Sequence, residues 1–186
     1  MSRPLRVAIL LSGSGRTLEN LCAQLASGEL SGLEIVNVGS NKPDVYGLVR
    51  AQNHEIPTFV EPDPSVALAH IESLDVDLIC LCGYLKLLPI PPRWEGKVLN
   101  IHPSLLPKFG GPGFYGHHVH EAVLAAGETE SGCTVHWCSG EYDRGPIVHQ
   151  ERVPVLPDDT PDTLAVRVFE AECRAYPAAL RIVMGR

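Results

Sequence analysis

The chain has 186 residues, of which 45% are hydrophobic and 20% charged, and its formal net charge is −7. This composition fits a single globular domain over residues 1–186. The 15 Lys and Arg residues are scattered rather than gathered in a basic stripe, which argues against a nucleic-acid-binding protein. No apolar run reaches the roughly 18 residues of a membrane span, so we expect no membrane partner and a cytoplasmic location.

Apolar runs alternate with helix-like segments through the first half of the chain. The run at 5–11 is followed by Ser-Gly rather than by a cleavage site, so we interpret it as a strand and not as a signal peptide. The expected strands are Leu5–Leu11, Glu34–Gly39, Leu78–Cys82 and Lys97–Ile101, and the expected helices are Thr17–Leu25, Val45–Asn53 and Ser65–Ser73. The stretch "LICLC" is apolar without alternation, as is typical of a parallel strand covered on both faces. The pattern predicts an α/β fold with an open, mostly parallel, Rossmann-like sheet and helices on both faces.

The second half of the chain has a different order of elements. A short helix is expected at His118–Ala126, followed by strands at Cys133–Cys138 and Ile147–Val155. The stretch "DDTPDT" announces the last helix, with Thr160 as N-cap and Pro161 as the first helical residue. We see no linker, repeat or low-complexity segment.

Six cysteines occur without any CxxC pair. Four of them lie in apolar runs, which indicates small buried side chains in a reducing compartment rather than a metal or disulfide framework.

A glycine-rich turn, "LLSGSGRTLEN", joins the first strand to the first helix. Gly13 and Gly15 allow a tight turn, and a helix N-terminus offers N–H groups to an anion. The Lys-Ser/Thr pair of a Walker A motif is missing, and Leu18 stands where a dinucleotide fingerprint has its third glycine. From these residues alone, an anion site and a plain strand-to-helix turn both remain open.

Two polar residues lie at the exit of the strand expected at Lys97–Ile101, in "NIHPSLLP". Alternation places Asn100 and His102 on one side of the strand. An amide and an imidazole suit the stabilisation of an oxyanion, and the imidazole also moves protons. Asp143, in the later turn "EYDRGP", is a candidate to orient or charge His102. Structural roles for these residues are the alternative.

Six stretches together resemble the phosphoribosylglycinamide formyltransferases of purine synthesis, a family of folate-dependent formyltransferases. They are "NIHPSLLPKF", "SGSGRTLEN", "SNKPDVYGLVRA", "CGYLKLLP", "HVHEAVLAAGETESGCTVHW" and "EYDRGPIVHQ". The resemblance implies transfer of a formyl group from 10-formyltetrahydrofolate, as co-substrate, to the amine of glycinamide ribonucleotide. It implies small-molecule substrates and no metal, and we expect a monomer or a homodimer.

The resemblance also implies the roles of individual residues. The catalytic residues are Asn100, His102 and Asp143, the last of which raises the pKa of the histidine. The ribonucleotide-binding residues are Gly13, Gly15, Arg16, Thr17 and Glu172. The folate-binding residues are Leu85, Lys86, Leu87, Leu88, Asn100 and Glu141.

Two further features leave alternatives open. Glu172 follows Leu164 and Val168 at helical spacing, so it is either a site residue or an acid that reaches solvent at the edge of the apolar stripe. The cluster "GHHVHEAVL" holds three histidines, but no HExxH-type spacing, so we interpret it as hydrogen-bonding rather than zinc-binding. We expect the same of His136.

The sequence also departs from the family pattern. No arginine occurs between Arg50 and Arg93, where the resemblance implies one that contacts the folate, and we expect no family C-terminal tail after the last helix. A methionyl-tRNA formyltransferase would need a further domain and a basic surface, which we do not find. A formyltransferase acting on a nucleotide-sugar amine and a non-catalytic nucleotide-binding module remain the alternatives.

Overall fold

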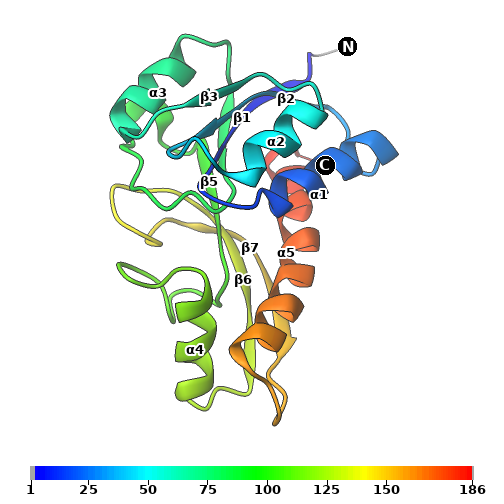
Figure 1. The fold of residues 1–186 in the computed structure, drawn as a ribbon, viewed down its shortest axis with the longest axis vertical. Helices are drawn as coiled ribbons and strands as arrows, with labels where there is room; N and C mark the ends of the chain where they lie inside the picture. The colour runs from blue at the N-terminus through cyan, green and yellow to red at the C-terminus, as the bar shows by residue number, and fades with distance from the viewer. Residues whose placement is uncertain (1–2, 186) are drawn as a thin grey trace. The chain divides into compact units, whose positions relative to one another are not determined.

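The chain forms two compact units in a computed structural model that describes residues 3–185. Unit 1 is Met1–Asn100 and unit 2 is Ile101–Arg186. Figure 1 traces the chain from one end to the other. The expectation of a single domain over 1–186 stays a prediction.

Unit 1 is built on parallel strands in the order β3-β2-β1-β4-β5. Their bounds are β1 Leu5–Leu11, β2 Leu33–Ser40, β3 Thr58–Val60, β4 Leu78–Leu81 and β5 Val98–His102. The last two residues of β5 belong to unit 2. All residues of the apolar run Leu78–Leu81 are buried, as expected for a parallel strand between two helical layers. The predicted open, mostly parallel α/β sheet is therefore confirmed.

Three helices cover this sheet, α1 Arg16–Ser27, α2 Tyr46–Asn53 and α3 Pro64–Glu72. The chain steps outward from β1 to β3 through α1 and α2, and it returns across the sheet to β4 through α3. Because βαβ crossovers are right-handed, α1 and α2 lie on one face and α3 on the other. Figure 1 shows α1 and α2 next to each other. The N-terminus of α1 therefore lies at the carboxyl end of β1, where ligands of such sheets bind.

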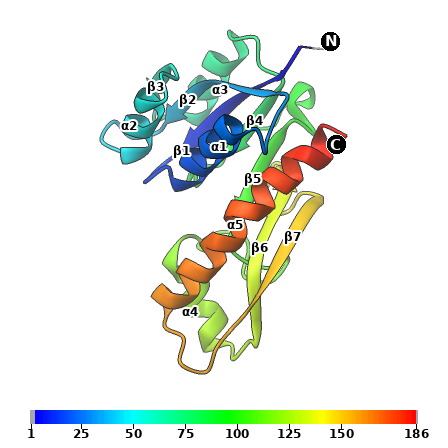
Figure 2. The ribbon, with the colours of Figure 1, turned by 90° about the vertical axis from the view of Figure 1, so that its right-hand side faces the viewer.

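Unit 2 combines α4 His117–Ala125 with an antiparallel pair, β6 Glu130–Trp137 and β7 Ile147–Pro154, and ends in α5 Pro161–Val183. Helix α5 packs along both strands and against α4, and Figure 2 shows it running beside the pair. The predicted cap is confirmed: the Thr160 hydroxyl accepts a hydrogen bond from the Thr163 N–H, and Pro161 is the first residue of the helix.

The expected elements are all present, with ends that differ by a few residues. The sequence analysis missed β3, Thr58–Val60, because three residues are too few to display a period of two. It also missed the single turn of 3₁₀ helix at Pro92–Trp94. Strand β6 begins at Glu130 rather than Cys133, because polar residues at its start hid the pattern.

The cysteines in the apolar runs have buried side chains, as predicted: Cys22, Cys80, Cys82 and Cys133. Burial raises the pKa of Cys22 to about 11 and that of Cys133 to about 12, so both stay protonated near neutral pH. None of the helices within residues 3–185 is long and apolar enough to span a membrane.

Candidate active site

The exit of β5 is tied to β6 by one buried hydroxyl. Thr134 Oγ1 accepts a hydrogen bond from the Leu106 N–H (3.0 Å) and donates one to the Ser104 carbonyl (2.7 Å). Thr134 itself is fully buried. A buried hydroxyl that both donates and accepts a hydrogen bond fixes the backbone groups that it contacts. This tie holds the segment that follows His102 within unit 2.

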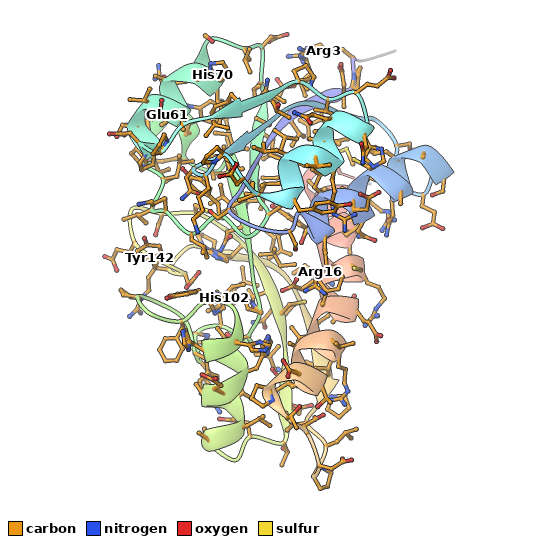
Figure 3. The ribbon with its side chains drawn as sticks, viewed as in Figure 1. Arg3, Arg16, Glu61, His70, His102 and Tyr142 are labelled. Atoms are coloured by element: carbon orange, nitrogen blue, oxygen red, sulfur yellow. The ribbon has the colours of Figure 1, made fainter. Side chains whose placement is uncertain are left out.

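His102, labelled in Figure 3, is the last residue of β5 and only 4% exposed. Its Nε2 donates to the Phe109 carbonyl at 2.7 Å, and its Nδ1 lies 3.4 Å from Asp143 Oδ2. Both ring nitrogens therefore face oxygen acceptors. Asn100 occupies the alternate position of the same strand, as predicted.

Asp143 comes from the turn between β6 and β7 and is held on several sides. The Gly111 N–H donates to its Oδ2 at 2.9 Å, and His136 Nε2 lies 3.6 Å from its Oδ1. Its backbone has φ 56°, a region that non-glycine residues rarely occupy. Such strain persists where the surroundings hold a residue in place, and it clusters at functional sites. The predicted pairing of Asp143 with His102 is thus present as geometry.

Burial and charge act in opposite directions on this pair. Burial lowers the pKa of His102, and the neighbouring Asp143 carboxylate and the Phe109 carbonyl only partly counter it. The expected raising influence of Asp143 is real, but the net pKa of His102 lies below its ordinary value. For Asp143, burial favours a higher pKa, but the His136 hydrogen bond, the His102 charge and the Gly111 N–H outweigh it and leave the pKa lowered. Asp143 is therefore ionised near neutral pH, and His102 favours its neutral form more than a free imidazole does.

His120 is a buried neutral histidine on α4. Its Nδ1 has no hydrogen-bond partner among residues 3–185. Burial, with smaller contributions from the charges of His117 and His102, lowers the pKa of His120 to about 4. The unfolded chain takes up a proton near pH 6.5 that the folded chain resists. We therefore expect the free energy of unfolding to fall as the pH drops from about 6.5 to about 4. His120 accounts for a loss on the order of 2 kcal/mol in the free energy of unfolding over this pH range, once solvent screening is allowed for.

Urea titrations of the wild type and of His120→Gln at pH 7 and pH 4.5 measure this contribution. The variant is expected to lose less stability between the two pH values than the wild type. His118→Gln, at an exposed position paired with Glu121, is the matched control and should follow the wild type. An equal loss in the wild type and His120→Gln would show that His120 does not resist protonation.

The glycine turn of unit 1 leads into α1 through Gly15, which has φ 72° and caps the helix without a side-chain bond. Arg16, labelled in Figure 3, is its first residue and is exposed, and Thr17 is half-buried. The turn is anchored at its start, where the Ser12 hydroxyl donates to Asn41 Oδ1 (2.5 Å) and accepts from the Leu85 N–H (2.9 Å). Residues that follow β1, β2 and β4 are thereby tied together at the carboxyl edge of the sheet.

The predicted folate segment follows β4. Leu85 and Leu87 are 47% and 40% exposed, so both side chains are accessible to a flat apolar ring. Lys86 is also exposed, whereas Leu88 is only 2% exposed and packs in the core of unit 1. In unit 2, the predicted Glu141 is exposed in a turn closed by Ser139.

Glu172 lies on α5, one turn beyond the buried Leu164 and Val168 stripe, and is half-buried. Its charge contributes to the raised pKa of Cys133 on β6, so it sits near the strands rather than on the outer face of the helix. This position leaves both the binding role and the solvent-edge alternative open.

Two histidines of "GHHVHEAVL" pair with carboxylates, and the rings of His117 and His120 lie edge to face at 6.4 Å. His117 contacts Asp162, and His118 lies 3.1 Å from Glu121. Among residues 3–185, no group of three or more His, Cys, Asp or Glu side chains is arranged to hold a metal ion.

The sequence matches the family described as "Formyl transferase" over residues 5–180, nearly the whole chain. The chain belongs to the formyl transferase family. A member of this family from Haemophilus influenzae, phosphoribosylglycinamide formyltransferase, is 39% identical over 95% of this chain and 85% of its own length. The crystal structure of phosphoribosylglycinamide formyltransferase from Brucella melitensis is 42% identical, with a TM-score of 0.86, and covers 97% of this chain and 96% of that one.

A larger relative contains a region similar to this chain. The trifunctional purine biosynthetic protein adenosine-3 of Gallus gallus is 46% identical over 96% of this chain. The chain spans only 18% of the length of that protein. The formyl transferase region is thus found both as most of one protein and as a small part of another.

Sequence reasoning missed two backbone partners of the predicted trio. The Phe109 carbonyl and the Gly111 N–H reach His102 and Asp143 through a turn that only the fold brings back to β5. His136 was expected to play a structural role near the site, and it faces the second carboxylate oxygen of Asp143. The glycine pair after "LLPKF" is the one signal available: a Cβ at Gly110 would lie 2.4 Å from Leu106 Cδ2 and 3.2 Å from Asp143 Cβ.

Proposed function

We propose that this formyl transferase moves a formyl group from 10-formyltetrahydrofolate to the amine of glycinamide ribonucleotide in purine biosynthesis. The observation that carries the proposal is the buried His102–Asp143 pair at the exit of β5, in a chain 39% identical to a phosphoribosylglycinamide formyltransferase along most of both lengths. An ordinary core histidine does not need a strained, ionised carboxylate beside it.

His102 and Asn100 are proposed to act on the carbonyl that the amine attacks. The attack builds negative charge on oxygen, and the Asn100 amide and a protonated His102 stabilise such charge. Asp143 favours the protonated form of His102 against the effect of burial. For His102 to reach the reacting atoms, Nε2 has to exchange the Phe109 carbonyl for the substrate. The same imidazole then supplies the proton that the departing nitrogen needs.

The exposed apolar side chains of Leu85 and Leu87 support binding of the folate donor, which supplies the activated formyl group. We propose that Lys86 and the backbone of this segment take part, and that Glu141 also binds the folate donor. Leu88 is buried in the core, so it anchors the segment and does not contact the folate ring.

The glycine turn and the first turn of α1 are proposed to hold the phosphate of the ribonucleotide. Gly13, Gly15, Arg16 and Thr17 supply backbone N–H groups, a guanidinium and a hydroxyl, and the helix N-terminus favours an anion. Glu172 is proposed to contact the acceptor. We further propose a cytoplasmic protein, monomeric or homodimeric, with small-molecule substrates and neither nucleic acid nor membrane as partner.

An assay of the purified chain with defined donors and acceptors tests the proposal. We expect turnover with 10-formyltetrahydrofolate and glycinamide ribonucleotide, and at least about tenfold lower kcat/KM with an amino sugar nucleotide as acceptor. Formate replaces the folate donor in a parallel reaction and is expected to give no product. Preference for the sugar nucleotide would establish the alternative acceptor, and binding without turnover would favour the non-catalytic module.

A further inference from the structure

Helix α2 holds the glycine turn of unit 1 by contacts that the proposed function does not use. The Gly47 N–H donates to the Gly13 carbonyl at 3.0 Å, and Arg50 Nε donates to the Ser14 carbonyl at 3.1 Å. Two successive carbonyls of the turn are therefore drawn toward α2. In a trans peptide the N–H points opposite to the carbonyl, so the N–H groups of Ser14 and Gly15 face away from α2.

The two backbones also meet at a point where only glycine fits. A Cβ on Gly15 would lie 2.5 Å from the Gly47 Cα, and a Cβ on Gly47 would lie 2.6 Å from Leu11 Cδ1. This close approach allows the short hydrogen bond from Gly47 and brings the Arg50 side chain within reach of the turn.

The guanidinium of Arg50 is itself held on three sides. Its NH1 donates to Glu19 Oε2 on α1 at 2.7 Å, and its plane lies 4.9 Å from the centre of the Tyr46 ring. His54 Nε2 lies 2.9 Å from the other oxygen of the same carboxylate. The Arg50 hydrogen bond, followed by that of His54, lowers the pKa of Glu19 and keeps it charged. A planar guanidinium satisfies the carbonyl and the carboxylate at once, which an ammonium does not.

We infer that Arg50 is a positioning residue for the acceptor phosphate: by clamping the Ser14 carbonyl against α2, it aims the Ser14 and Gly15 amides at the phosphate. Glu19 fixes the direction of the guanidinium. Two of the five Arg50 N–H donors are bound, Nε to the Ser14 carbonyl and NH1 to Glu19, and these two bonds hold the guanidinium against the turn. The inference rests on the proposed function of the glycine turn.

Steady-state kinetics of the full-length Arg50→Ala variant tests the inference with two acceptors, glycinamide ribonucleotide and its dephosphorylated ribonucleoside. We expect the KM for the ribonucleotide to rise about tenfold. The kcat, the KM for the folate donor and the kcat/KM for the ribonucleoside should stay within about twofold of the wild type. Arg50→Lys and Glu19→Gln are expected to give intermediate KM values, because each retains only part of the clamp.

Arg152→Ala is the matched control, since it removes an exposed Arg–Glu pair, with Glu130, in unit 2. It should leave every constant unchanged. Equal losses of Arg50→Ala with both acceptors, or a fall in kcat alone, would overturn the positioning role.

Amide chemical shifts of the wild type on addition of inorganic phosphate separate this inference from the proposed function. The Ser14 and Gly15 amides are expected to shift in the wild type and to shift at higher phosphate concentration in Arg50→Ala. Unchanged amides in the wild type would remove the anion site on which the inference depends. If the amides shift at the same phosphate concentration in both proteins, the positioning role of Arg50 is overturned while the anion site stands. This holds whatever the outcome of the turnover assay.

Discussion

His102→Ala is expected to lower kcat for formyl transfer by about 10²–10⁴-fold, the usual contribution of a positioned acid–base group. The imidazole is buried, lies 3.4 Å from Asp143 and is the group at the β5 exit that is able to carry a proton. Because Ala also leaves a gap and removes the hydrogen bond from His102 to the Phe109 carbonyl, the His102→Gln variant accompanies it. Gln retains an N–H donor without the ability to titrate.

Asp143→Asn isolates the charge of the carboxylate from its shape. Asn tolerates the positive φ of this position and still offers an oxygen to the Gly111 N–H. The variant is expected to fold with a thermal midpoint near that of the wild type and to lose at least about tenfold in kcat. Since the carboxylate raises the pKa of His102 against burial, its removal moves the His102 limb of the pH–kcat profile to lower pH.

The activity of the His102 variants and of Asp143→Asn is measured as a function of pH, and circular dichroism checks that each variant is folded. Near-wild-type kcat in either folded variant would show that the pair is a structural feature of unit 2. An unshifted pH profile in Asp143→Asn, with reduced kcat, would show that Asp143 does not act through the charge of His102.

Gly15→Val is expected to raise the Kd for the ribonucleotide about tenfold or more and the Kd for the folate donor far less. A β-branched residue at φ 72° is strained, and its Cβ would meet the Gly47 Cα at 2.5 Å. The turn therefore has to leave α2, which misdirects the amides proposed to hold the phosphate. The strain is expected to cost about 1–3 kcal/mol of stability as well.

Gly13→Ala is the matched control for stability, because a Cβ at Gly13 meets no atom within 4 Å and its φ is not positive. It should fold as stably as the wild type. Isothermal titration of both ligands into Gly15→Val gives the comparison. An equal loss of affinity for the ribonucleotide and for the folate would contradict the proposal that this turn binds the phosphate.

Much of this protein was determined by the sequence alone because the deciding interactions are local. The apolar run Leu78–Leu81 without alternation predicted a buried parallel strand, and Thr160–Pro161 predicted the start of α5. The spacing of Asn100 and His102 predicted that both lie on one side of β5, since alternation along a strand needs no knowledge of the rest of the fold.

The tertiary structure alone decided what surrounds these residues. The balance between burial and charge that lowers the pKa of His102 depends on how tightly the turn at Phe109 and Gly111 closes over it. The clamp of Arg50 on Ser14 joins positions 36 residues apart, and no local pattern marks it. Strand and helix formation follow from neighbours along the chain, whereas the direction of an amide and the pKa of a buried ring follow from neighbours in space.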